Sequence, residues 1–596
     1  MLCSKSVKTA DVLDAIPEVQ LYHNFLAKIY AEEKFESCLI YGEVRSSETL
    51  ALLLRITVED FKQPIIFQSK HSSYQIANIF NRNILVIAQL ESFDVELLVV
   101  SDILELVRQM RIILIDVEVG TKSNTEQYLR QIFRLCEAEK MLNVVAIFAD
   151  FPHTKVFYSY TIFPTFELEE KSLSVGGVEV FPQRLKNLHG YGIRTIPDQI
   201  FPFSFAYELD GHIQVAGYLQ KLLEAFAKSV NGSLAYPKPL VLDNMYFPAS
   251  LLNMTRSNEI DIPMARMYLQ VSRTFRTASK PFSISGLCVI APIQWYYTFQ
   301  DFYNMYSIRI YIALTSIGVL TIYTLFYWCS RLQCLRAGRP CYQNLFLAIT
   351  EPSAMALYVG TAQPTHLNRL WTLCILIFLS MVWTLCVHTQ FSANLNTFIT
   401  EPTMMPNPSQ WEDLSKNGHK ILISAYNYQY IAQWCGELCE NLEKYLVLVE
   451  TQEQSRREMQ KLNTSYAYLV DLFTWQFMQL RMRPLKKPIF RLTDMCVRKE
   501  IVYCLPLQPN SIFKDALNLF LTRVVDHGLR QFWIDAAYLE AISSGKMHNI
   551  TYTDTELRPL DMEYMSFAWS LFGYAWTLAI FIFACEVLVG WRQQLM

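Results

Sequence analysis

Hydrophobic residues follow two patterns along this chain: short apolar runs spaced by polar segments, and stretches of membrane-spanning length after residue 300. In residues 1–180, short apolar runs alternate with segments of helical periodicity such as Thr125 to Lys140. The runs are Ser37 to Tyr41, Pro64 to Phe67, Asn83 to Ala88, Arg111 to Val117, Asn143 to Phe148 and Val156 to Ile162. Because strands that alternate with helices form parallel sheets with crossover helices, this pattern predicts an N-terminal α/β domain over residues 1–180. No glycine-rich phosphate loop accompanies the strands, so we expect a structural or assembly role for it.

Two further segments, residues 181–305 and 401–562, are predicted to mix strands and helices. In the first, prolines mark turns before an amphipathic helix at Tyr218 to Val230 and a strand at Leu287 to Ala291. The second contains a strand, a long helical stretch, a turn and an amphipathic helix. These are Lys420 to Ser424, Ile431 to Leu462, Pro506 to Asn510 and Ser511 to Phe532.

Three apolar stretches have about the length needed to cross the roughly 30 Å hydrocarbon core of a bilayer. They fall in residues 308–330, 370–400 and 567–590, at Ile308 to Cys329, Trp371 to Val387 and Phe567 to Val589. Arg331, Arg336 and Arg339 follow the first stretch, and basic residues favour the cytoplasmic side. We therefore expect three spans, with residues before 308 and residues 401–562 outside the cell and residues 591–596 as a cytoplasmic tail.

Residues 343–361 are apolar but too short to cross a membrane, and they contain Glu351 and Pro352. Backbone that leaves helical geometry at membrane depth is tolerated where protein or a water-filled cavity covers it, so the segment favours a re-entrant pore loop. The candidate pore-loop residues are Glu351, Gly360 and Gln363. A hydrophobic cytoplasmic loop is the alternative, in which Glu351 faces the cytoplasm.

Composition agrees with a membrane protein that has water-soluble parts, because 52% of the 596 residues are hydrophobic and 14% are aromatic. A net charge of -3, from 52 basic and 55 acidic residues, gives no basic field for nucleic acid. The 14 cysteines show no pair of CxxC motifs, so no metal site is expected. A disulfide is possible among four of them, with the pairing left open: Cys435, Cys439, Cys496 and Cys504.

The first twenty residues contain no apolar core of signal-peptide length, although the expected topology places them outside the cell. Either the printed start is incomplete or the export signal is atypical. Four glycosylation sequons, at Asn231, Asn253, Asn463 and Asn549, all fall in the segments expected outside. About this many sequons arise by chance, so their support is modest.

The second apolar stretch ends in an unusual tip, from Gln390 to Pro402, where small and amide side chains alternate with bulky ones. Gln390 to Thr400 resembles the Ser-Tyr-Thr-Ala-Asn-Leu-Ala-Ala-Phe-Leu-Thr signature of ionotropic glutamate receptors. The resemblance implies a pore-lining helix whose gate residues are Ser392, Ala393, Asn394, Leu395 and Phe398. Close helix packing is the alternative use of such small residues.

Other segments extend this resemblance over residues 181–592. Ser279 to Phe282 is similar to the family's Phe-Ser-Lys-Pro-Phe segment, and Tyr466 to Asp471 resembles its Tyr-Ala-Phe-Leu-Leu-Glu. Pro509 to Trp533 resembles the helical segment before the last span. The chain is thus identified as a member of the divergent insect ionotropic chemosensory receptors. The expected fold is a periplasmic-binding-protein-like, bilobed α/β ligand-binding domain, formed by residues 181–305 and 401–562 and split by an α-helical pore domain.

The ligand contacts that the resemblance implies are largely altered. The position of the family's carboxylate-binding arginine is Ser272, with Arg273 beside it, and Arg266 falls within the replaced Pro-Leu-Thr segment. No Gly-Ser-Thr follows Ser424 to form an anion-binding helix start. Asp471 stands where the family has an ammonium-binding Glu and is the one of four recognition elements that survives, in shortened form. Because the other three are lost, glutamate is not the expected ligand. A capping or solvated role for Asp471, and a surface role for both arginines, remain open.

The resemblance implies a cation channel subunit, opened by a small chemosensory ligand such as a tastant, pheromone or odour. It further implies a hetero-tetramer with co-receptor subunits in the plasma membrane of a sensory dendrite or cilium. A non-conducting ligand-binding or assembly subunit is one alternative, and a polytopic transporter is a more remote one. The sequence contains no HExxH, GxSxG or kinase motif set, so we expect neither an enzyme nor a cofactor.

Overall fold

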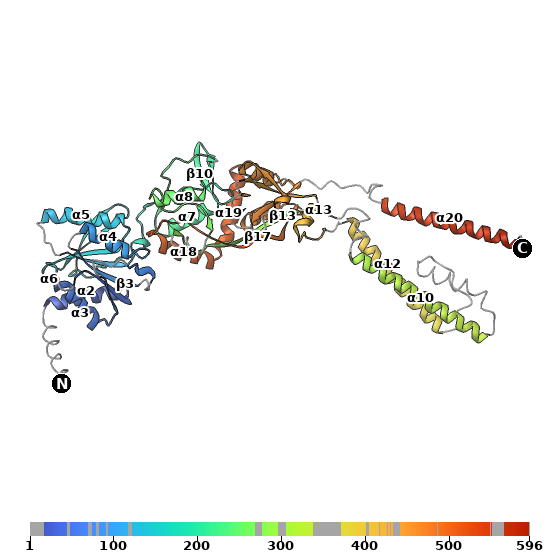
Figure 1. Cartoon of the computed structure of the whole chain (residues 1–596), viewed down its shortest axis with the longest axis horizontal. Helices are drawn as coiled ribbons and strands as arrows, with labels where there is room; N and C mark the ends of the chain where they lie inside the picture. The colour runs from blue at the N-terminus through green and yellow to red at the C-terminus, as the bar shows by residue number, and fades with distance from the viewer. Residues whose placement is uncertain are drawn as a thin grey trace, which may run out of the picture.

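The computed structural model describes most of the chain outside the pore-loop segment. The described residues are 17–43, 48–68, 74–78, 83–90, 93–116, 122–242, 244–268, 277–295, 306–337, 371–400, 404–416, 418–425, 427–428, 431–432, 442–485, 487–548, 550 and 566–594. They form a multi-sheet α/β protein with mixed sheets and long helices towards the C-terminal half (Figure 1).

A β-sheet organises the N-terminal part of the chain, drawn in blue in Figure 1. It has seven strands in the order β2-β1-β3-β4-β5-β6-β7. Its strands are β1 (Ser37–Tyr41), β2 (Ile65–Gln68), β3 (Ile84–Leu90), β4 (Arg111–Asp116), β5 (Val144–Phe148), β6 (Val156–Thr161) and β7 (Glu167–Ser172). Helices α2 (Pro17–Glu32) and α3 (Glu48–Glu59) cover one face, and α4 (Phe93–Ile103) and α5 (Lys122–Ala138) cover the other. Because both faces are covered, every residue of β3 is buried, which explains its continuous apolar run.

The predicted strands are confirmed, but the sheet is not wholly parallel. Strands β1 to β5 are parallel, whereas β6 pairs antiparallel with β5 and β7 antiparallel with β6. Only the short helix α6 (Phe151–Thr154) separates β5 from β6, and a connection of that length is too short for a parallel crossover. The sequence pattern missed β7 because its residues, ELEEKS, are mostly charged.

The next part of the chain forms what we call the first core, a cluster of buried apolar side chains around Leu219, Phe226 and Ile534. Its elements are β8 (Gly192–Arg194), β9 (Phe205–Leu209), β10 (His212–Ala216), α7 (Tyr218–Ser229) and β11 (Ser233–Ala235), with α18 (Lys514–Asp526) and α19 (Leu529–Ser543) from far along the chain. Helix α8 (Pro248–Arg256) packs beside it through a smaller cluster. The helix predicted at Tyr218 to Val230 is confirmed as α7.

A six-stranded sheet, ordered β12-β17-β13-β16-β14-β15, carries what we call the second core. Its strands are β12 (Met267–Tyr268), β13 (Ser283–Pro292), β14 (Lys420–Ser424), β15 (Leu446–Val449), β16 (Tyr466–Asp471) and β17 (Phe490–Cys504). The cluster also holds side chains of α13 (Trp411–Lys416), α16 (Gln452–Gln460) and α17 (Leu472–Met482). The predicted strands at Leu287 to Ala291 and Lys420 to Ser424 are confirmed.

Strands β13 and β17 run antiparallel from one core to the other. Ser283 pairs with Tyr503 beside the first core, and Pro292 pairs with Phe490 beside the second. Helix α17 contacts both cores, because Phe473 and Phe477 pack into the first while Trp475 and Met478 pack into the second. Two strands and one helix therefore connect the cores.

The structure corrects two predicted helices and the disulfide. The stretch predicted helical from Ile431 to Leu462 contains β15 as well as α16. The helix predicted over Ser511 to Phe532 is two helices, which separate at Gly528, where φ is +65° and glycine is strongly favoured. A disulfide joins Cys288 of β13 to Cys496 of β17, while Cys504 is free and buried, and Cys435 and Cys439 lie outside the described residues.

Each predicted span coincides with a long helix: α10 (Tyr306–Ala337), α12 (Trp371–Thr400) and α20 (Ser566–Gln594). Helices α10 and α12 lie side by side (Figure 1), with the Tyr311 hydroxyl donating to the carbonyl of Val387 and Trp383 packed against Gly318. Within the described residues, one helix segment, Ala568–Cys585 of α20, is long and apolar enough to cross a membrane. The corresponding apolar segment of α10 is the shorter Ile308–Gly318.

Candidate ligand-binding site

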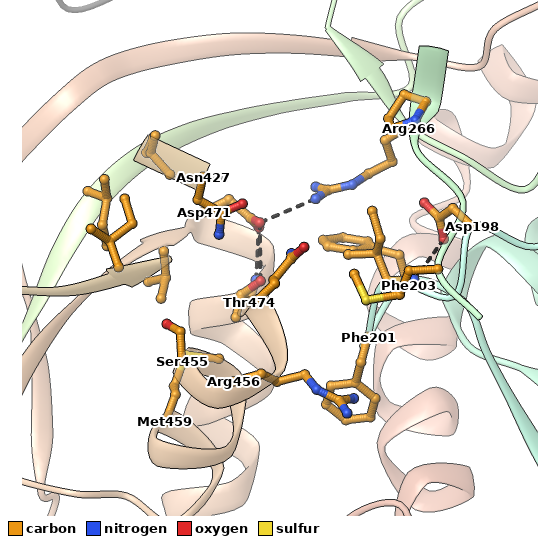
Figure 2. A pocket seen from close by; sticks show the side chains of 18 of the residues that line it. Asp198, Phe201, Phe203, Arg266, Asn427, Ser455, Arg456, Met459, Asp471 and Thr474 are labelled. Atoms are coloured by element: carbon orange, nitrogen blue, oxygen red, sulfur yellow. Dashed lines mark hydrogen bonds and ion pairs between the residues drawn. The ribbon is translucent and has the colours of Figure 1, made fainter. Parts of the chain in front are cut away.

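A cavity of about 290 Å³ lies between the first and second cores, close to the usual size of small-molecule sites. Residues from two distant parts of the chain line it, as Figure 2 shows. One group comprises Asp198, Phe201, Phe203, Tyr246, Phe247, Arg266 and Tyr268. The other comprises Asn427, Glu453, Ser455, Arg456, Met459, Tyr468, Asp471, Thr474 and Tyr503. The cavity therefore exists only where the two cores face each other.

Arg266 and Asp471, both predicted as ligand-binding residues, meet in this cavity. Nη2 of Arg266 lies 3.3 Å from Oδ2 of Asp471, and only 15% and 13% of their side chains are exposed. Arg266 precedes β12, and Asp471 ends β16. Their ion pair spans the space between the two cores (Figure 2).

Asp471 also caps helix α17. Its Oδ1 accepts a hydrogen bond from the backbone N–H of Thr474 at 2.9 Å, and its Oδ2 accepts from the Thr474 hydroxyl at 3.1 Å. An aspartate suits this position because its oxygens satisfy unpaired N–H groups of the first turn. The capping role left open by the sequence is therefore confirmed, and any contact with ligand is additional to it.

Two aromatic rings hold the Arg266 guanidinium. It lies over the ring of Phe203 and over that of Tyr503, whose centroid is 4.5 Å from the guanidinium carbon. Burial raises the pKa of Tyr503, with Arg266 opposing the shift and Asp471 adding to it. Because a planar guanidinium stacks well on rings, this contact orients Arg266 towards Asp471.

A second arginine lines the cavity from α16. Arg456 pairs with Glu453 one turn earlier, at 2.5 Å between Nη2 and Oε2, and its guanidinium carbon lies 6.0 Å from the centroid of Phe201. The pKa of Glu453 is lowered despite burial, through hydrogen bonds and charge interactions with Arg456 and Arg457. Both arginines that line the cavity are therefore neutralised by carboxylates of this chain.

Asp198 is the third carboxylate of the cavity, and its side chain is almost fully buried, with the residue 2% exposed. Its Oδ1 accepts hydrogen bonds from the Ser204 hydroxyl at 2.6 Å and from the Ile200 N–H at 3.1 Å. Burial raises its pKa to about 7, against the opposing effects of these hydrogen bonds and of the charge of Arg266. The group is thus poised between its acid and its carboxylate near neutral pH.

The segments that join the second core to α10 and α12 are held together. Trp295 pairs with Met404 in an antiparallel bridge, and the Met405 N–H donates to the Gln294 carbonyl at 2.9 Å. Arg491, at the start of β17, donates to the carbonyls of Met405 and Pro406, at 2.6 Å each. Burial lowers the pKa of Arg491. Both segments are therefore fixed to each other, and the segment after α12 is also fixed to the start of β17.

Several predicted positions lie outside the described residues, namely Ser272, Arg273, Glu351, Gly360, Gln363 and Asn549. The candidate gate residues all lie on the last turns of α12: Ser392, Ala393, Asn394, Leu395 and Phe398. Ala393 and Asn394 are exposed, whereas Phe398 is buried. Of the sequons, Asn231 and Asn253 are exposed and Asn463 is half-buried.

Sequence analysis did not identify Asp198, Arg456 or Tyr503 as site residues. Asp198 follows Pro197 in a segment that reads as a turn, where an aspartate is ordinary. Arg456 lies in the charged run QEQSRREMQ, which is typical of a solvated helix. Among the described residues no cluster of three or more His, Cys, Asp and Glu side chains is placed to hold a metal ion.

Comparison with known proteins gives no relative from which a role can be transferred. No family model matches the chain, and a search of curated proteins finds no match.

Proposed function

We propose that this protein is a subunit of a ligand-gated, cation-permeable channel that acts as a chemosensory receptor. The observation that carries the proposal is the cavity between the two cores, bridged by the Arg266–Asp471 ion pair. The second core is also tied, through Trp295 and Met404, to the segments that lead to α10 and from α12. A ligand that binds in the cavity thus has a mechanical route to the long helices.

In this proposal the two cores are the lobes of a periplasmic-binding-protein-like clamshell. A ligand that fits the closed arrangement better than the open one draws the second core towards the first. Because Arg491 holds the segment after α12 to the second core, that movement pulls on α12. The tips of α12, around Asn394 and Phe398, then separate and open the gate.

The proposed membrane domain consists of α10, α12 and α20 with a re-entrant loop between α10 and α12. These helices contain 32, 30 and 29 residues. At 1.5 Å per residue, each is longer than the roughly 30 Å hydrocarbon core. The contact between Gly318 and Trp383 supports a packed helical hairpin, since small residues allow close approach.

The proposed setting is the plasma membrane of a sensory dendrite or cilium, with the N-terminus and both cores outside and with co-receptor subunits completing a tetramer. The Cys288–Cys496 disulfide supports an extracellular position for the cores, because disulfides persist in oxidising compartments. The exposed Ala393 and Asn394 support assembly, since partner helices are needed to cover a gate.

A subunit that binds ligand without conducting is the second candidate. It is favoured by the finding that, within the described residues, α20 alone contains a segment of sufficient length and apolarity to span a membrane. Both candidates share the ligand cavity. They differ in whether α12 lines the path of the ions.

The test is to co-express the full chain with candidate co-receptor subunits and record currents evoked by amines, acids, tastants and cuticular lipids. Asn394→Lys places a positive charge at the proposed gate, so we expect cation current to fall at least tenfold while surface expression is unchanged. Asn24→Lys, on the exposed surface of α2, is the matched control and should conduct normally. Unaltered gating and permeation in Asn394→Lys would refute the pore role and leave the non-conducting candidate.

A further inference from the structure

The charges that line the cavity do not balance. Asp198, Glu453 and Asp471 contribute three carboxylates, and Arg266 and Arg456 contribute two guanidinium groups. Arg266 pairs with Asp471, and Arg456 pairs with Glu453. None of the ion pairs found among the described residues includes Asp198, and both hydrogen bonds that it accepts fall on Oδ1. One buried carboxylate therefore lines the cavity without an ion-pair partner, and the charge of Arg266, which is paired with Asp471, acts on it from a distance.

A buried carboxylate without an ion-pair partner is costly, because it has left water without gaining an opposite charge in direct contact. The protein relieves this cost partly by protonation, as the pKa of about 7 indicates. A cationic ligand group would relieve it fully. The cavity thus has a specific chemical preference that its two internal ion pairs do not satisfy.

We propose that Asp198 binds the ammonium group of a small organic amine in this cavity. An ammonium has three donors on a compact charge and needs only one carboxylate. A calcium ion would need six or more oxygen ligands, and no group of three or more His, Cys, Asp and Glu side chains among the described residues is placed to hold a metal ion. The inference rests on the proposed ligand-binding role of the cavity and names its ligand class.

The rest of the cavity wall fits an apolar amine. Phe201, Met245 and Phe247 line the cavity together with Asp198, and the backbone of Tyr246 is hydrogen-bonded to the Asp198 carbonyl at 3.0 Å. These side chains offer apolar surface within the same cavity as the carboxylate. Aromatic rings also attract ammonium groups. An alkyl or arylalkyl amine therefore matches the site better than a polar amino acid.

The experiment measures binding to the detergent-solubilised full chain by calorimetry, with two pairs of probes that differ only in the head group. The pairs are 2-phenylethylamine with 2-phenylethanol, and hexylamine with hexan-1-ol. At pH 8 we expect at least one amine to bind about tenfold or more tightly than its alcohol. Asp198→Asn should remove this difference, whereas Asp210→Asn, at an exposed turn, should keep it.

The wild-type chain provides a second test that does not depend on the folding of a variant. The charged groups that face Asp198 are Arg266 and, through it, Asp471, while Tyr503 stays neutral because burial raises its pKa. An alkylammonium stays protonated below about pH 10. Amine affinity should therefore fall as pH drops from 8 through about 7, the pKa of Asp198, to 5.5, while alcohol affinity changes little.

Three results would overturn the amine subsite: no amine preference in the wild type, a preference that Asp198→Asn retains, or one that does not fall with pH. Failure of the amine subsite can be distinguished from failure of the proposed channel function. Amine binding without evoked current would leave the subsite standing and remove the channel role. If other ligands evoked currents but the chain showed no preference for amines, the channel role would stand and the amine subsite would be refuted.

Discussion

Arg266 and Asp471 are 205 residues apart in the chain but form an ion pair in the cavity, and Asp471 has two further structural roles. Asp471 ends a strand, caps α17 and receives the charge of Arg266, while Arg266 is stacked between two rings. Because both side chains are mostly buried, water screens their interaction less than it screens a surface pair. This pair is therefore expected to contribute to the contact between the cores as well as to the shape of the cavity.

A double-mutant cycle tests this expectation. Asp471→Asn keeps an oxygen to cap α17 but removes the charge, and Arg266→Met removes the guanidinium. We expect a coupling energy of about 1–3 kcal/mol in chemical denaturation of the full chain. The exposed pair Arg130–Glu126 on α5, with side chains 52% and 61% exposed, is the matched control and should couple by no more than about 0.5 kcal/mol. Equal coupling energies in the two cycles would show that the buried pair stabilises the protein no more than an exposed surface pair does.

At the scale of elements, β13 and β17 connect the two cores. They pair along most of their length, with register shifts between Ser285 and Ile290, and the Cys288–Cys496 disulfide lies among those shifts. Arg491 lies at the start of β17, beside the second core, where it holds the segment after α12 through two hydrogen bonds. The strands thus connect the ligand cavity to the long helices.

Replacing Arg491 tests that connection. Arg491→Met removes both hydrogen bonds to the carbonyls of Met405 and Pro406, and Arg491→Lys lacks the planar fork that serves two acceptors at once. We expect both variants to bind ligand with unchanged affinity while evoked current falls, about tenfold for Met and less for Lys. Lys499→Met, on the exposed part of β17, is the control. Parallel losses of affinity and current would point to damage of the cavity instead.

At the scale of the whole molecule, the N-terminal sheet and the first core share a packed contact. Leu142 and Phe163 belong to the first core's cluster, and the ring of Phe163 lies 6.2 Å from that of Phe513. Lys140 donates to the Gln508 side chain at 2.8 Å, and Asn510 accepts from the Leu106 N–H at 2.6 Å. The N-terminal part is therefore docked on the first core, which suits a support against which the second core moves.

Removing the ring of Phe513 should weaken this docking. Phe513 is 1% exposed, so Phe513→Ala leaves a cavity and should destabilise the contact by about 3–5 kcal/mol. Hydrogen exchange should rise in residues 141–142 and 185–193 while the second core keeps its protection. Phe532→Ala, at a side chain that is 68% exposed, should change exchange little. An unchanged exchange pattern in Phe513→Ala would contradict the proposed docking.

Much of the local structure was predictable because its signals lie within a few residues of each other. The apolar run Ser37 to Tyr41 is β1, and the amphipathic segment after Gly217 is α7. The misses have physical causes as well. The charged strand β7 carries no apolar signal. The break between α18 and α19 depends on the positive φ of one residue, Gly528, and a single glycine within a helical pattern does not by itself predict a break.

Local patterns predicted β1 to β6, β13, β14, helix α7 and the three long apolar stretches, since periodicity and length depend on neighbouring residues. The sequence also indicated Arg266 and Asp471 as separate candidates. Three facts depend on the tertiary structure: these two residues pair, Cys288 bonds to Cys496 across 208 residues, and Asp198 is buried without an ion-pair partner among the described residues. Such facts depend on which distant segments pack together. Burial and ion pairing arise from those tertiary contacts and are not encoded in any one segment.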